Sequence, residues 1–400
     1  MKLKTIRDFD FANTQVVMRV DFNVPIQNGI IVDDFRIRSA ILSIEKIIND
    51  GGSVILLSHL VRPKGSLEPA FSLKPVAQKL ADILGKRVIF EMDIMSDSAL
   101  ELTQNLPPQS IVLMENVRFY SGEQENDPDF ARRLSQFGKI YVNDAFGTAH
   151  RAHASTEGIA EFFDRRLAGF LMEKEWQFLV GEVENARHPF VAVMGGAKIS
   201  GKVDLIEKIL PKVDKILLGG GMVFTFFAER GLEIGKSLID NDSRAIVRNL
   251  LSEEKIILPS DVCVAEFIDS KSGESVDISQ IPANYAGFDI GAKTIRAYQN
   301  ILNSAKTILW NGPMGVSENP AFATGTFEIA KTIIDSTKNG AVSIVGGGDS
   351  ASALKKMGLD REVSHLSTGG GASLRLLSGK KMPALERLEK CTNGKDHNEA

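Results

Sequence analysis

Short runs of apolar, mostly β-branched residues alternate along the chain with segments in which apolar residues recur at helical spacing. The apolar runs predict strands at 16–20, 53–57, 110–114, 139–142, 190–194, 215–218, 307–310 and 341–345. The segments between them predict helices at 36–49, 73–84, 128–137, 202–210, 222–230, 241–253, 325–337 and 349–357. Regular alternation of this kind is typical of a parallel, doubly wound α/β sheet.

One longer amphipathic segment, residues 168–189, separates two sets of predicted strands and ends at Pro189. The chain has 400 residues, which is more than one hydrophobic core usually accommodates. We therefore expect an α/β protein with two doubly wound (Rossmann-like) parallel-sheet domains joined by a long interdomain helix. The expected domains are residues 1–170 and 171–380, followed by a C-terminal tail at 381–400 whose last part, 390–400, is polar.

Composition narrows the classes of function. The chain is 43% hydrophobic and 24% charged, with a net charge of −4, so nothing in it favours a nucleic-acid or membrane-surface binder. Cys263 and Cys391 are the only cysteines, and they have neither the spacing of metal ligands nor that of a disulfide framework. We find no apolar leader at the N-terminus and no apolar run of ~20 residues. We expect a cytoplasmic protein without nucleic-acid or membrane partners.

The residues that follow the predicted strands differ between the two halves. In open α/β sheets ligands bind beyond the carboxyl ends of the strands. In the first half these ends read DFN (21–23), SHLVR (58–62), ENVR (115–118) and NDAFGTAHRAH (143–153). In the second half they read GGAK (195–198), GGG (219–221), NGPMG (311–315), GGGD (346–349) and STGGG (367–371).

Glycines follow the same division, with 10 in residues 1–170 and 25 in residues 171–400. Arginine and histidine side chains suit a small, highly charged anion. Bare backbone suits a larger ligand whose phosphates approach backbone N–H groups and helix N-termini. The two halves together indicate a two-substrate enzyme that joins a small acid to a nucleotide.

Six basic residues of the first half are candidates for the anion site: Arg36, His59, Arg62, Arg118, His150 and Arg151. Any one of them could be a solvated surface residue. Four of the six lie immediately after apolar strands, and solvation does not explain that placement. We interpret the set as an anion site.

The segment VMGGAKISGKV (193–203) matches the P-loop pattern up to Lys202, but Val203 stands where a P-loop has the Ser or Thr that binds Mg²⁺. Lys198 and Lys202 would share a helix face near the phosphates if the helix starts early, or they could be a solvated helix start. The glycine runs fit either phosphate contacts or close helix–strand packing. Asp349 fits either a helix N-cap or a Mg²⁺ ligand.

Ten segments, in order over nearly the whole chain, resemble the phosphoglycerate kinase family. They are RVDFNVP (19–25), DDFRIRSA (33–40), SHLVRPKG (58–65), ENVRFY (115–120), NDAFGTAHRAHAST (143–156), GGAKISGK (195–202), LLGGGMVFTF (217–226), WNGPMGV (310–316), GGGDSASAL (346–354) and STGGGASL (367–374). The resemblance implies reversible phosphoryl transfer from 1,3-bisphosphoglycerate to MgADP, giving 3-phosphoglycerate and ATP in glycolysis and gluconeogenesis. It also implies a monomer with interdomain hinge closure.

The resemblance assigns roles to individual residues. The acid substrate would be bound by Asp21, Phe22, Asn23, Arg36, His59, Leu60, Val61, Arg62, Arg118, His150 and Arg151. The nucleotide would be bound by Gly195, Lys198, Lys202, Gly219, Gly220, Asn311, Pro313, Gly315, Val316, Glu318, Gly346, Gly347, Gly348, Asp349 and Ser350, with Asp349 on Mg²⁺. Catalysis would rest on Arg36, Lys198 and Lys202, with backbone N–H groups around Gly348 and Gly371.

The chain departs from the family pattern at five positions. Val61 replaces a usual Gly, Gly201 an Asp, Ala292 a Pro, Ser317 a bulky aromatic residue and Arg375 a Glu. The Gly at 201 creates the P-loop match, which is therefore accidental. We expect Val203 to face helix packing rather than a metal ion.

The implied reaction joins oxygens that are already ionised near pH 7, so it needs no general base, and the motifs offer cations but no base–nucleophile pair. Two other functions stay open at this point: another acid–nucleotide kinase or ligase, and a catalytically silent nucleotide-binding or scaffold protein. A Rossmann dehydrogenase would need a G-x-G-x-x-G followed by an acidic residue ~20 positions later, which we do not find.

Overall fold

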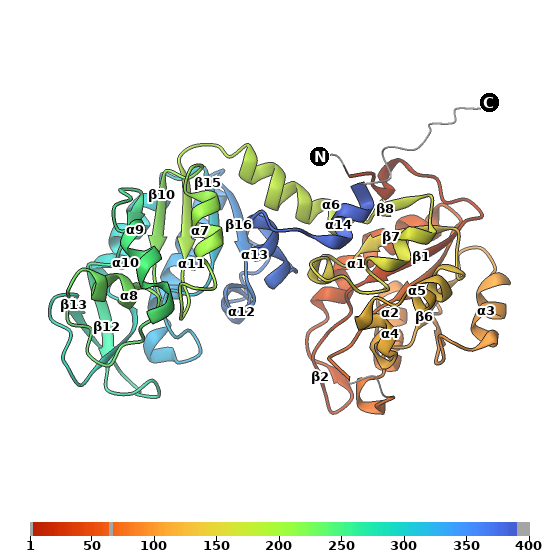
Figure 1. Ribbon diagram of the computed structural model, residues 1–400, viewed down its shortest axis with the longest axis horizontal. Helices are drawn as coiled ribbons and strands as arrows, with labels where there is room; N and C mark the ends of the chain where they lie inside the picture. Colours follow the sequence, from red (N-terminus) through yellow and green to blue (C-terminus); the bar gives the residue numbers. More distant parts are fainter. Residues whose placement is uncertain (1–2, 64–66, 390–400) are drawn as a thin grey trace. The chain divides into compact units, whose positions relative to one another are not determined.

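The computed structural model describes residues 3–63 and 67–389, which form two compact units (Figure 1). Of the described residues, 3–63, 67–177 and 381–389 belong to unit 1, and 178–380 belong to unit 2. The predicted polar tail at 390–400, with Cys391, and the end of the segment 58–65 lie outside the described residues. Each unit is described by itself below.

Unit 1 is built on a six-stranded sheet in the order β5-β6-β4-β1-β7-β8, with every neighbouring pair parallel. Its strands are β1 (Gln15–Val20), β4 (Ser53–Leu57), β5 (Ile89–Glu91), β6 (Ile111–Met114), β7 (Ile140–Asp144) and β8 (Arg166–Ala168). In β1 the residue Val17 pairs with Ile55 of β4 and Tyr141 of β7. The central strands β1, β4, β6 and β7 are mainly apolar and almost fully buried, as expected for a sheet with helices on both faces.

Alternate residues of the central strands of unit 1 enter two separate cores. Val16 and Met18 pack with the apolar faces of α1 (Phe35–Asn49) and α2 (Lys74–Leu84). Val17 packs on the opposite face with α3 (Asp97–Gln104) and α5 (Pro128–Ser135). The short helix α4 (Ser121–Glu125) directly precedes α5. The unit is therefore a three-layer α/β/α sandwich.

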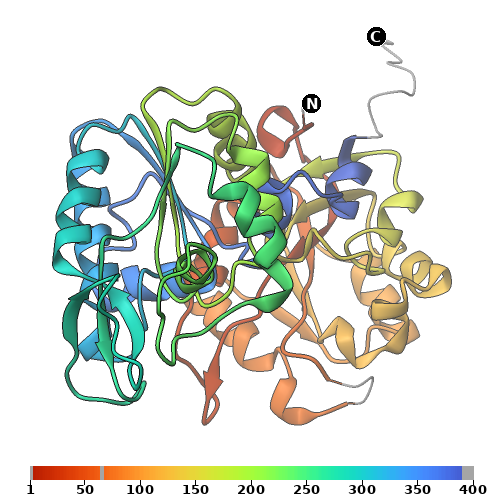
Figure 2. The ribbon, with the colours of Figure 1, turned by 60° about the vertical axis from the view of Figure 1, so that its left-hand side comes forward.

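Unit 2 repeats this plan with a parallel sheet in the order β11-β10-β9-β15-β16-β17. The strands are β9 (Phe190–Met194), β10 (Lys215–Leu218), β11 (Ile256–Ile257), β15 (Thr307–Asn311), β16 (Val342–Gly346) and β17 (His365–Leu366). The helices are α7 (Val203–Ile209), α8 (Val223–Glu229), α9 (Arg244–Leu250), α10 (Ala292–Leu302), α11 (Thr324–Lys338), α12 (Gly348–Lys356) and α13 (Gly371–Leu377). Figure 2 shows helices on both sides of these strands.

The predicted fold class is confirmed, and all eight predicted strands are present with ends within two residues of the expected positions. The prediction missed a three-stranded antiparallel sheet in unit 2, ordered β13-β12-β14. Its strands are β12 (Asp261–Ala265), β13 (Glu274–Asp277) and β14 (Ala286–Ile290). It also missed the hairpin of β2 (Ile26–Gln27) and β3 (Ile30–Ile31) in unit 1.

The segment expected as one long connecting helix begins at α6 (Phe170–Trp176) and continues into a π-helical stretch at Gln177–Glu182. The division between the two units falls at Gln177 and Phe178, where the π-helical stretch starts. The Asp144 carboxylate at the end of β7 accepts a hydrogen bond from the N–H of Met172 at 3.0 Å. This bond ties the beginning of α6 to the sheet of unit 1.

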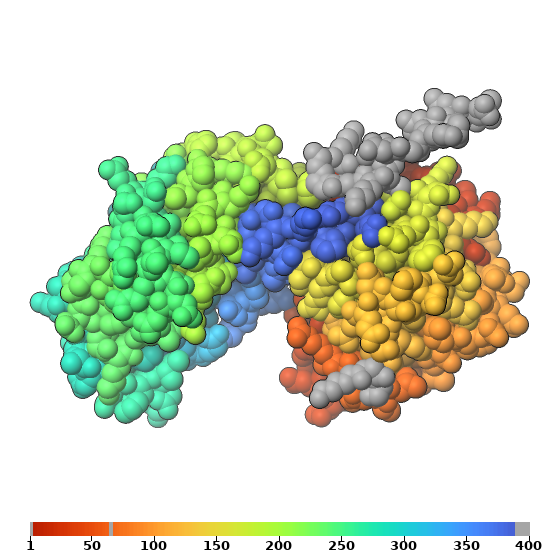
Figure 3. Space-filling model, in the orientation of Figure 1, coloured from red at the N-terminus to blue at the C-terminus, as the bar shows by residue number. Residues whose placement is uncertain are grey.

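Part of the predicted tail is helical. Residues Pro383–Glu389 form α14, which contacts β8 and the short 3₁₀ helix η5 (Gly158–Phe162) of unit 1. In Figure 3 the blue end of the described chain lies against the yellow surface of unit 1. Its Ala384 N–H donates to the carbonyl of Ala149 at 3.2 Å. Arg387 forms ion pairs with Glu157 and Glu161. No helix in the described part of the chain has the length and apolar character needed to cross a membrane.

Candidate functional site

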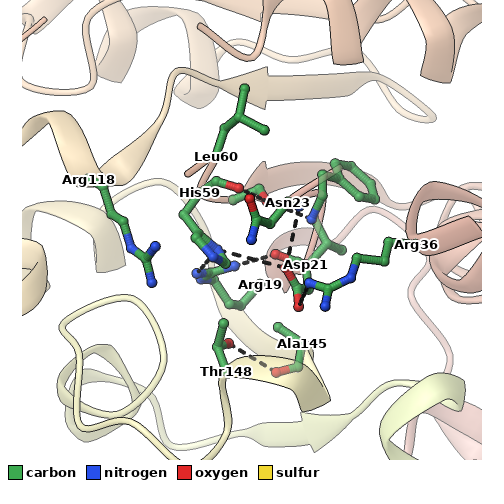
Figure 4. Close-up of polar contacts among 12 residues, drawn as sticks. Arg19, Asp21, Asn23, Arg36, His59, Leu60, Arg118, Ala145 and Thr148 are labelled. Atoms are coloured by element: carbon green, nitrogen blue, oxygen red, sulfur yellow. Dashed lines mark hydrogen bonds and ion pairs between the residues drawn. The ribbon is translucent and has the colours of Figure 1, made fainter. Parts of the chain in front are cut away.

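The carboxyl ends of β1, β4 and β6 carry a cluster of polar side chains in unit 1 (Figure 4). Asp21 follows β1 directly, His59 comes two residues after β4, and Arg118 lies just beyond β6 in the 3₁₀ helix at Val117–Phe119. Carboxyl ends of neighbouring parallel strands lie at the same edge of a sheet. The structure brings these three predicted residues together there, with Arg36 from the first turn of α1. We call these four side chains the acid cluster, after the acid substrate that the family resemblance assigns to them.

Direct contacts fix the positions of the side chains in the acid cluster. The guanidinium of Arg36 pairs with Asp21 Oδ2 at 2.5 Å. A guanidinium nitrogen of Arg19 lies 3.2 Å from His59 Nδ1. The other oxygen of Asp21 is 3.9 Å from the same imidazole nitrogen, too far for a hydrogen bond.

The electrostatics of the acid cluster are strongly positive. Burial, followed by the charges of Arg19, Arg118, Arg151 and Arg36, holds the pKa of His59 well below its usual range. Burial and the neighbouring Arg151 lower the pKa of Arg118 to about 10. The Nε of Arg118 is buried without a hydrogen-bond partner among the described residues. A buried, unpaired donor is costly, and an anion bound in the cluster would relieve that cost.

Two side chains hold the backbone of the loop after β4. Asn23 Oδ1 accepts from the N–H of Val61 at 2.9 Å, and Arg118 donates to the Val61 carbonyl. The side chains of Phe22 and Leu60 are buried in the core, so these two residues can offer a ligand only their backbone.

Val61, which replaces a usual Gly, has φ +57. Of the five non-glycine residues with positive φ among those described, it is the only β-branched one. Its side chain is 42% exposed, so it gains little from packing. We expect Val61→Gly to raise the free energy of unfolding by up to about 1 kcal/mol, because relief of left-handed strain exceeds the entropy cost of glycine. Urea denaturation measures this change.

Val32→Gly is the matched control for this substitution. Val32 is 53% exposed, and its φ is not positive. There the change should lower the free energy of unfolding by roughly 0.5–1 kcal/mol. Equal losses in the two variants would contradict backbone strain at Val61.

Arg151 acts on the acid cluster from the loop after β7, and His150 lies beside it. Arg151 Nε donates to His150 Nε2 at 3.2 Å. Burial and the charge of Arg62 lower the pKa of Arg151. Arg62 also acts on Arg118, although its own side chain is exposed. The predicted cations therefore share one electrostatic environment.

Sequence reasoning missed three members of this environment: Arg19, Glu123 and Ser155. Arg19 lies inside the apolar run of β1 and is fully buried. A charged residue within such a run is costly unless it is paired, and this signal could have identified it. Glu123 in α4 and Ser155 in the loop after β7 carry no comparable sequence signal.

Unit 2 contains a cavity of about 570 Å³. Six of the predicted nucleotide residues line it: Gly220, Pro313, Gly315, Val316, Glu318 and Asp349. Phe267, Ile268 and Phe288 supply apolar walls that the sequence did not indicate. A cavity of this size, with apolar walls and a few polar groups, suits a drug-sized ligand such as a nucleotide.

The glycines of unit 2 fall into two classes. A Cβ on Gly195 would lie 1.9 Å from the Pro313 carbonyl oxygen, and one on Gly219 would lie 2.6 Å from Met314 Sδ. These two glycines therefore fit the close-packing alternative. Gly348 and Gly371, which begin α12 and α13, have no atom within 4 Å of such a Cβ. The space beside these two helix starts is open to a ligand.

Lys202 is held beside the end of β15. Its Nζ donates to Asn311 Oδ1, and burial lowers its pKa to about 8, against the opposing effect of Asp349. Asn311 is buried, and its Nδ2 has no hydrogen-bond partner within the described ranges. The two lysines do not share a helix face, because α7 begins at Val203, after both of them, and so the early helix start on which that alternative depended is absent. Lys198 is exposed in the preceding loop.

Asp349 is the second residue of α12 and is exposed. The N-cap alternative is wrong, because the cap position is Gly347 and no side chain caps the helix. The neighbouring Ser350 is buried, and its Oγ accepts from the N–H of Gly312 at 2.7 Å. Within residues 3–63 and 67–389, no group of three or more His, Cys, Asp or Glu is arranged to hold a metal ion.

The structure explains some of the remaining departures from the family pattern by their local surroundings. Ala292 is the first residue of α10, where Pro is favoured but not required. Gly201 is exposed with open space around its Cβ position, so a side chain would fit there. Ser317 is buried, with its N–H bonded to the Gly315 carbonyl. Nothing in the structure explains Arg375. Val203 is buried in the apolar face of α7, as expected.

Comparison with known proteins agrees with the motifs. A family model described as phosphoglycerate kinase matches residues 6–380. Phosphoglycerate kinases of Chlorobaculum tepidum and Chloroherpeton thalassium are 48% and 46% identical, over 97% of this chain and 100% and 99% of theirs. The solved phosphoglycerate kinase of Coxiella burnetii is 39% identical with a TM-score of 0.88, covering 97% of this chain and 99% of that one. The chain belongs to the phosphoglycerate kinase family.

Proposed function

We propose that this protein catalyses reversible phosphoryl transfer from 1,3-bisphosphoglycerate to MgADP, giving 3-phosphoglycerate and ATP. The observation that carries the proposal is the set of guanidinium groups gathered around the neutral His59 in unit 1. The proposal extends to a cytoplasmic monomer acting in glycolysis and gluconeogenesis, as the family resemblance implies.

We assign the acid substrate to the acid cluster. 3-Phosphoglycerate carries a carboxylate and a phosphate, and both favour guanidinium partners. Arg118, with its unpaired buried Nε, and Arg151 and Arg62 supply the positive charge. Asp21 and Asn23 orient Arg36 and the loop at Val61. Arg36 is the cation that we place on the phosphoryl group in transfer.

We assign the nucleotide to the cavity of unit 2. Phe267, Ile268 and Phe288 would contact the base, and Glu318 the ribose hydroxyls. Lys198, Lys202 and the N–H groups at the starts of α12 and α13 would meet the phosphates. Mg²⁺ usually binds one or two carboxylates plus substrate phosphates, and the single exposed carboxylate of Asp349 fits that requirement.

Catalysis then depends on positioning and charge. A carboxylate and a diphosphate terminus are ionised near pH 7, so no side chain has to remove a proton. Cations aimed at the equatorial oxygens offset the charge that they carry during transfer. Bound Mg²⁺ would neutralise phosphate charge, Arg36 would orient the phosphoryl group of the acid, and Lys198 and Lys202 would orient the phosphates of the nucleotide.

A coupled spectrophotometric assay with 3-phosphoglycerate and MgATP tests the function. We expect turnover that depends on both substrates and on Mg²⁺. Acetate and glutamate in place of 3-phosphoglycerate separate this activity from other acid–nucleotide kinases. Turnover with either acid, and none with 3-phosphoglycerate, would overturn the proposal.

Two substitutions test the metal assignment. Asp349→Ala should weaken MgADP binding about tenfold, with free ADP less affected, because it removes one charged ligand. Val203→Thr should leave the affinities for Mg²⁺ and ATP unchanged, because this side chain packs in the core. Calorimetry measures both. A gain of Mg²⁺-dependent affinity in the Thr variant would restore the P-loop interpretation.

A further inference from the structure

A chain of buried hydrogen bonds leads from Glu123 to His59. Glu123 is fully buried, and its two oxygens accept from the Ser155 N–H at 2.8 Å and the Ser155 hydroxyl at 2.7 Å. Arg19 Nε donates to Ser155 Oγ at 2.7 Å, and another nitrogen of Arg19 lies 3.2 Å from His59 Nδ1. The chain joins α4, the loop after β7, β1 and the end of β4.

Each link in this chain allows only one direction of donation. Arginine has donors and no acceptor, so Ser155 Oγ accepts from Arg19 and directs its own proton to Glu123. For the same reason, His59 Nδ1 must accept from Arg19. An imidazole that accepts at Nδ1 and is neutral carries its proton on Nε2.

We propose that Glu123 and Ser155 are positioning residues that act through Arg19 to hold His59 as the neutral Nε2–H tautomer. His59 then offers the bound acid a single N–H donor of fixed direction and no positive charge. This role toward the acid rests on the proposed function, whereas the tautomer itself does not depend on it.

The charges that face His59 support the neutral form. The cations Arg19, Arg36, Arg118 and Arg151 all oppose a further positive charge on the ring. Asp21 has the carboxylate nearest the ring, and its 3.9 Å separation from Nδ1 is too long for a hydrogen bond. Its charge favours a protonated ring, but burial and the four cations outweigh it. The Nδ1 of His59 is thus occupied by Arg19 alone.

Glu123 also balances the buried charge of Arg19. Both of its oxygens accept hydrogen bonds, which is the pattern of an ionised carboxylate. Burial raises the pKa of Glu123, and the positive charge of Arg19 opposes that rise. The neighbouring His153 lies 3.7 Å from Glu123 Oε1, and burial lowers its pKa to about 4, so it is neutral near pH 7.

NMR of the unmodified full chain with ¹⁵N-labelled histidine tests the tautomer directly. Long-range ¹H–¹⁵N correlations distinguish the two neutral tautomers from the imidazolium, and His59→Gln assigns the signal. We expect the Nε2–H tautomer from pH 6 to pH 8. An Nδ1–H tautomer or an imidazolium in this range would overturn the proposal.

Variants test the positioning role. Ser155→Ala and Glu123→Gln should mix the tautomers of His59 and raise KM for 3-phosphoglycerate about tenfold, with KM for ATP changed less than twofold. Ser155→Thr keeps the hydroxyl and should restore both readouts. Ser336→Ala removes a buried hydroxyl of unit 2 that bonds only backbone carbonyls, and it should change neither. An unchanged tautomer and KM in both Ser155→Ala and Glu123→Gln would refute the positioning role.

Titration with 3-phosphoglycerate separates this inference from the proposed function. We expect the acid to shift the His59 Nε2 resonance. An Nε2–H tautomer that 3-phosphoglycerate leaves unperturbed would support the positioning chain but refute the acid site.

Discussion

Replacement of Arg36 by alanine is expected to lower kcat by at least about 100-fold while leaving KM for ADP nearly unchanged. Arg36 pairs with Asp21 at 2.5 Å, which holds its guanidinium in the acid cluster while about a third of its side chain stays exposed. A cation placed on the transferring group acts mainly in the transition state, so its loss appears in kcat. Steady-state kinetics in both directions measure the effect.

Arg38→Ala is the matched control, because Arg38 lies on the same helix two residues later. Its side chain is exposed and pairs with Asp34 at 2.9 Å. This variant should keep its kcat within about twofold, because surface ion pairs contribute little. An Arg36→Ala enzyme with unchanged kcat would remove Arg36 from the reaction.

Lys202→Met is expected to reduce kcat/KM for MgADP at pH 7 by about 1,000-fold, since Lys202 is proposed to hold the transferring phosphates. In the unmodified enzyme the same parameter should fall above about pH 8. The pKa of Lys202 is lowered to about 8 by burial, so the free enzyme loses this charge there. The Met variant should lack this dependence on pH.

The pKa shift of Lys202 should affect stability in the opposite direction to activity, because its contribution to the free energy of unfolding rises with pH. The folded chain releases this proton near pH 8, and the unfolded chain only near the ordinary lysine value of 10.5. Between these values the unfolded state binds more protons, so the contribution of Lys202 to the free energy of unfolding rises with pH. The free energy of unfolding of the unmodified protein, relative to that of Lys202→Met, should therefore rise between about pH 8 and pH 10. Lys215→Met, at the exposed amino end of β10, is the kinetic control and should change neither activity nor its pH profile.

The strands that could be predicted are those whose apolar runs are continuous. The runs at 53–57 and 190–194 have the bounds that the structure shows, because both faces of these strands are buried. Strands of two or three residues, such as β5 and β17, are too short to show a recognisable hydrophobic pattern in the sequence. The antiparallel sheet was missed because β13 is mostly polar and only partly buried.

The candidate site was predictable where side chains follow a strand, as at Asp21 and His59. It was not predictable where the geometry of the site depends on a contact between distant segments. Glu123 and Ser155 are 32 positions apart and meet only in the folded unit. Lys202 was identified from the sequence. Its bond to Asn311, 109 positions away, fixes the direction of its side chain, and spacing in the sequence does not reveal that direction.

The return of α14 to unit 1 has a consequence for synthesis on the ribosome. Unit 2 is one uninterrupted stretch of chain, whereas unit 1 needs residues from both ends. Domains generally fold as they emerge, N-terminal part first. Here the hydrogen bond from the N–H of Ala384 to the carbonyl of Ala149, one residue before His150, can form only after residue 384 has been synthesised. Unit 2 can therefore fold during translation, whereas unit 1 is completed only after α14 has emerged from the ribosome.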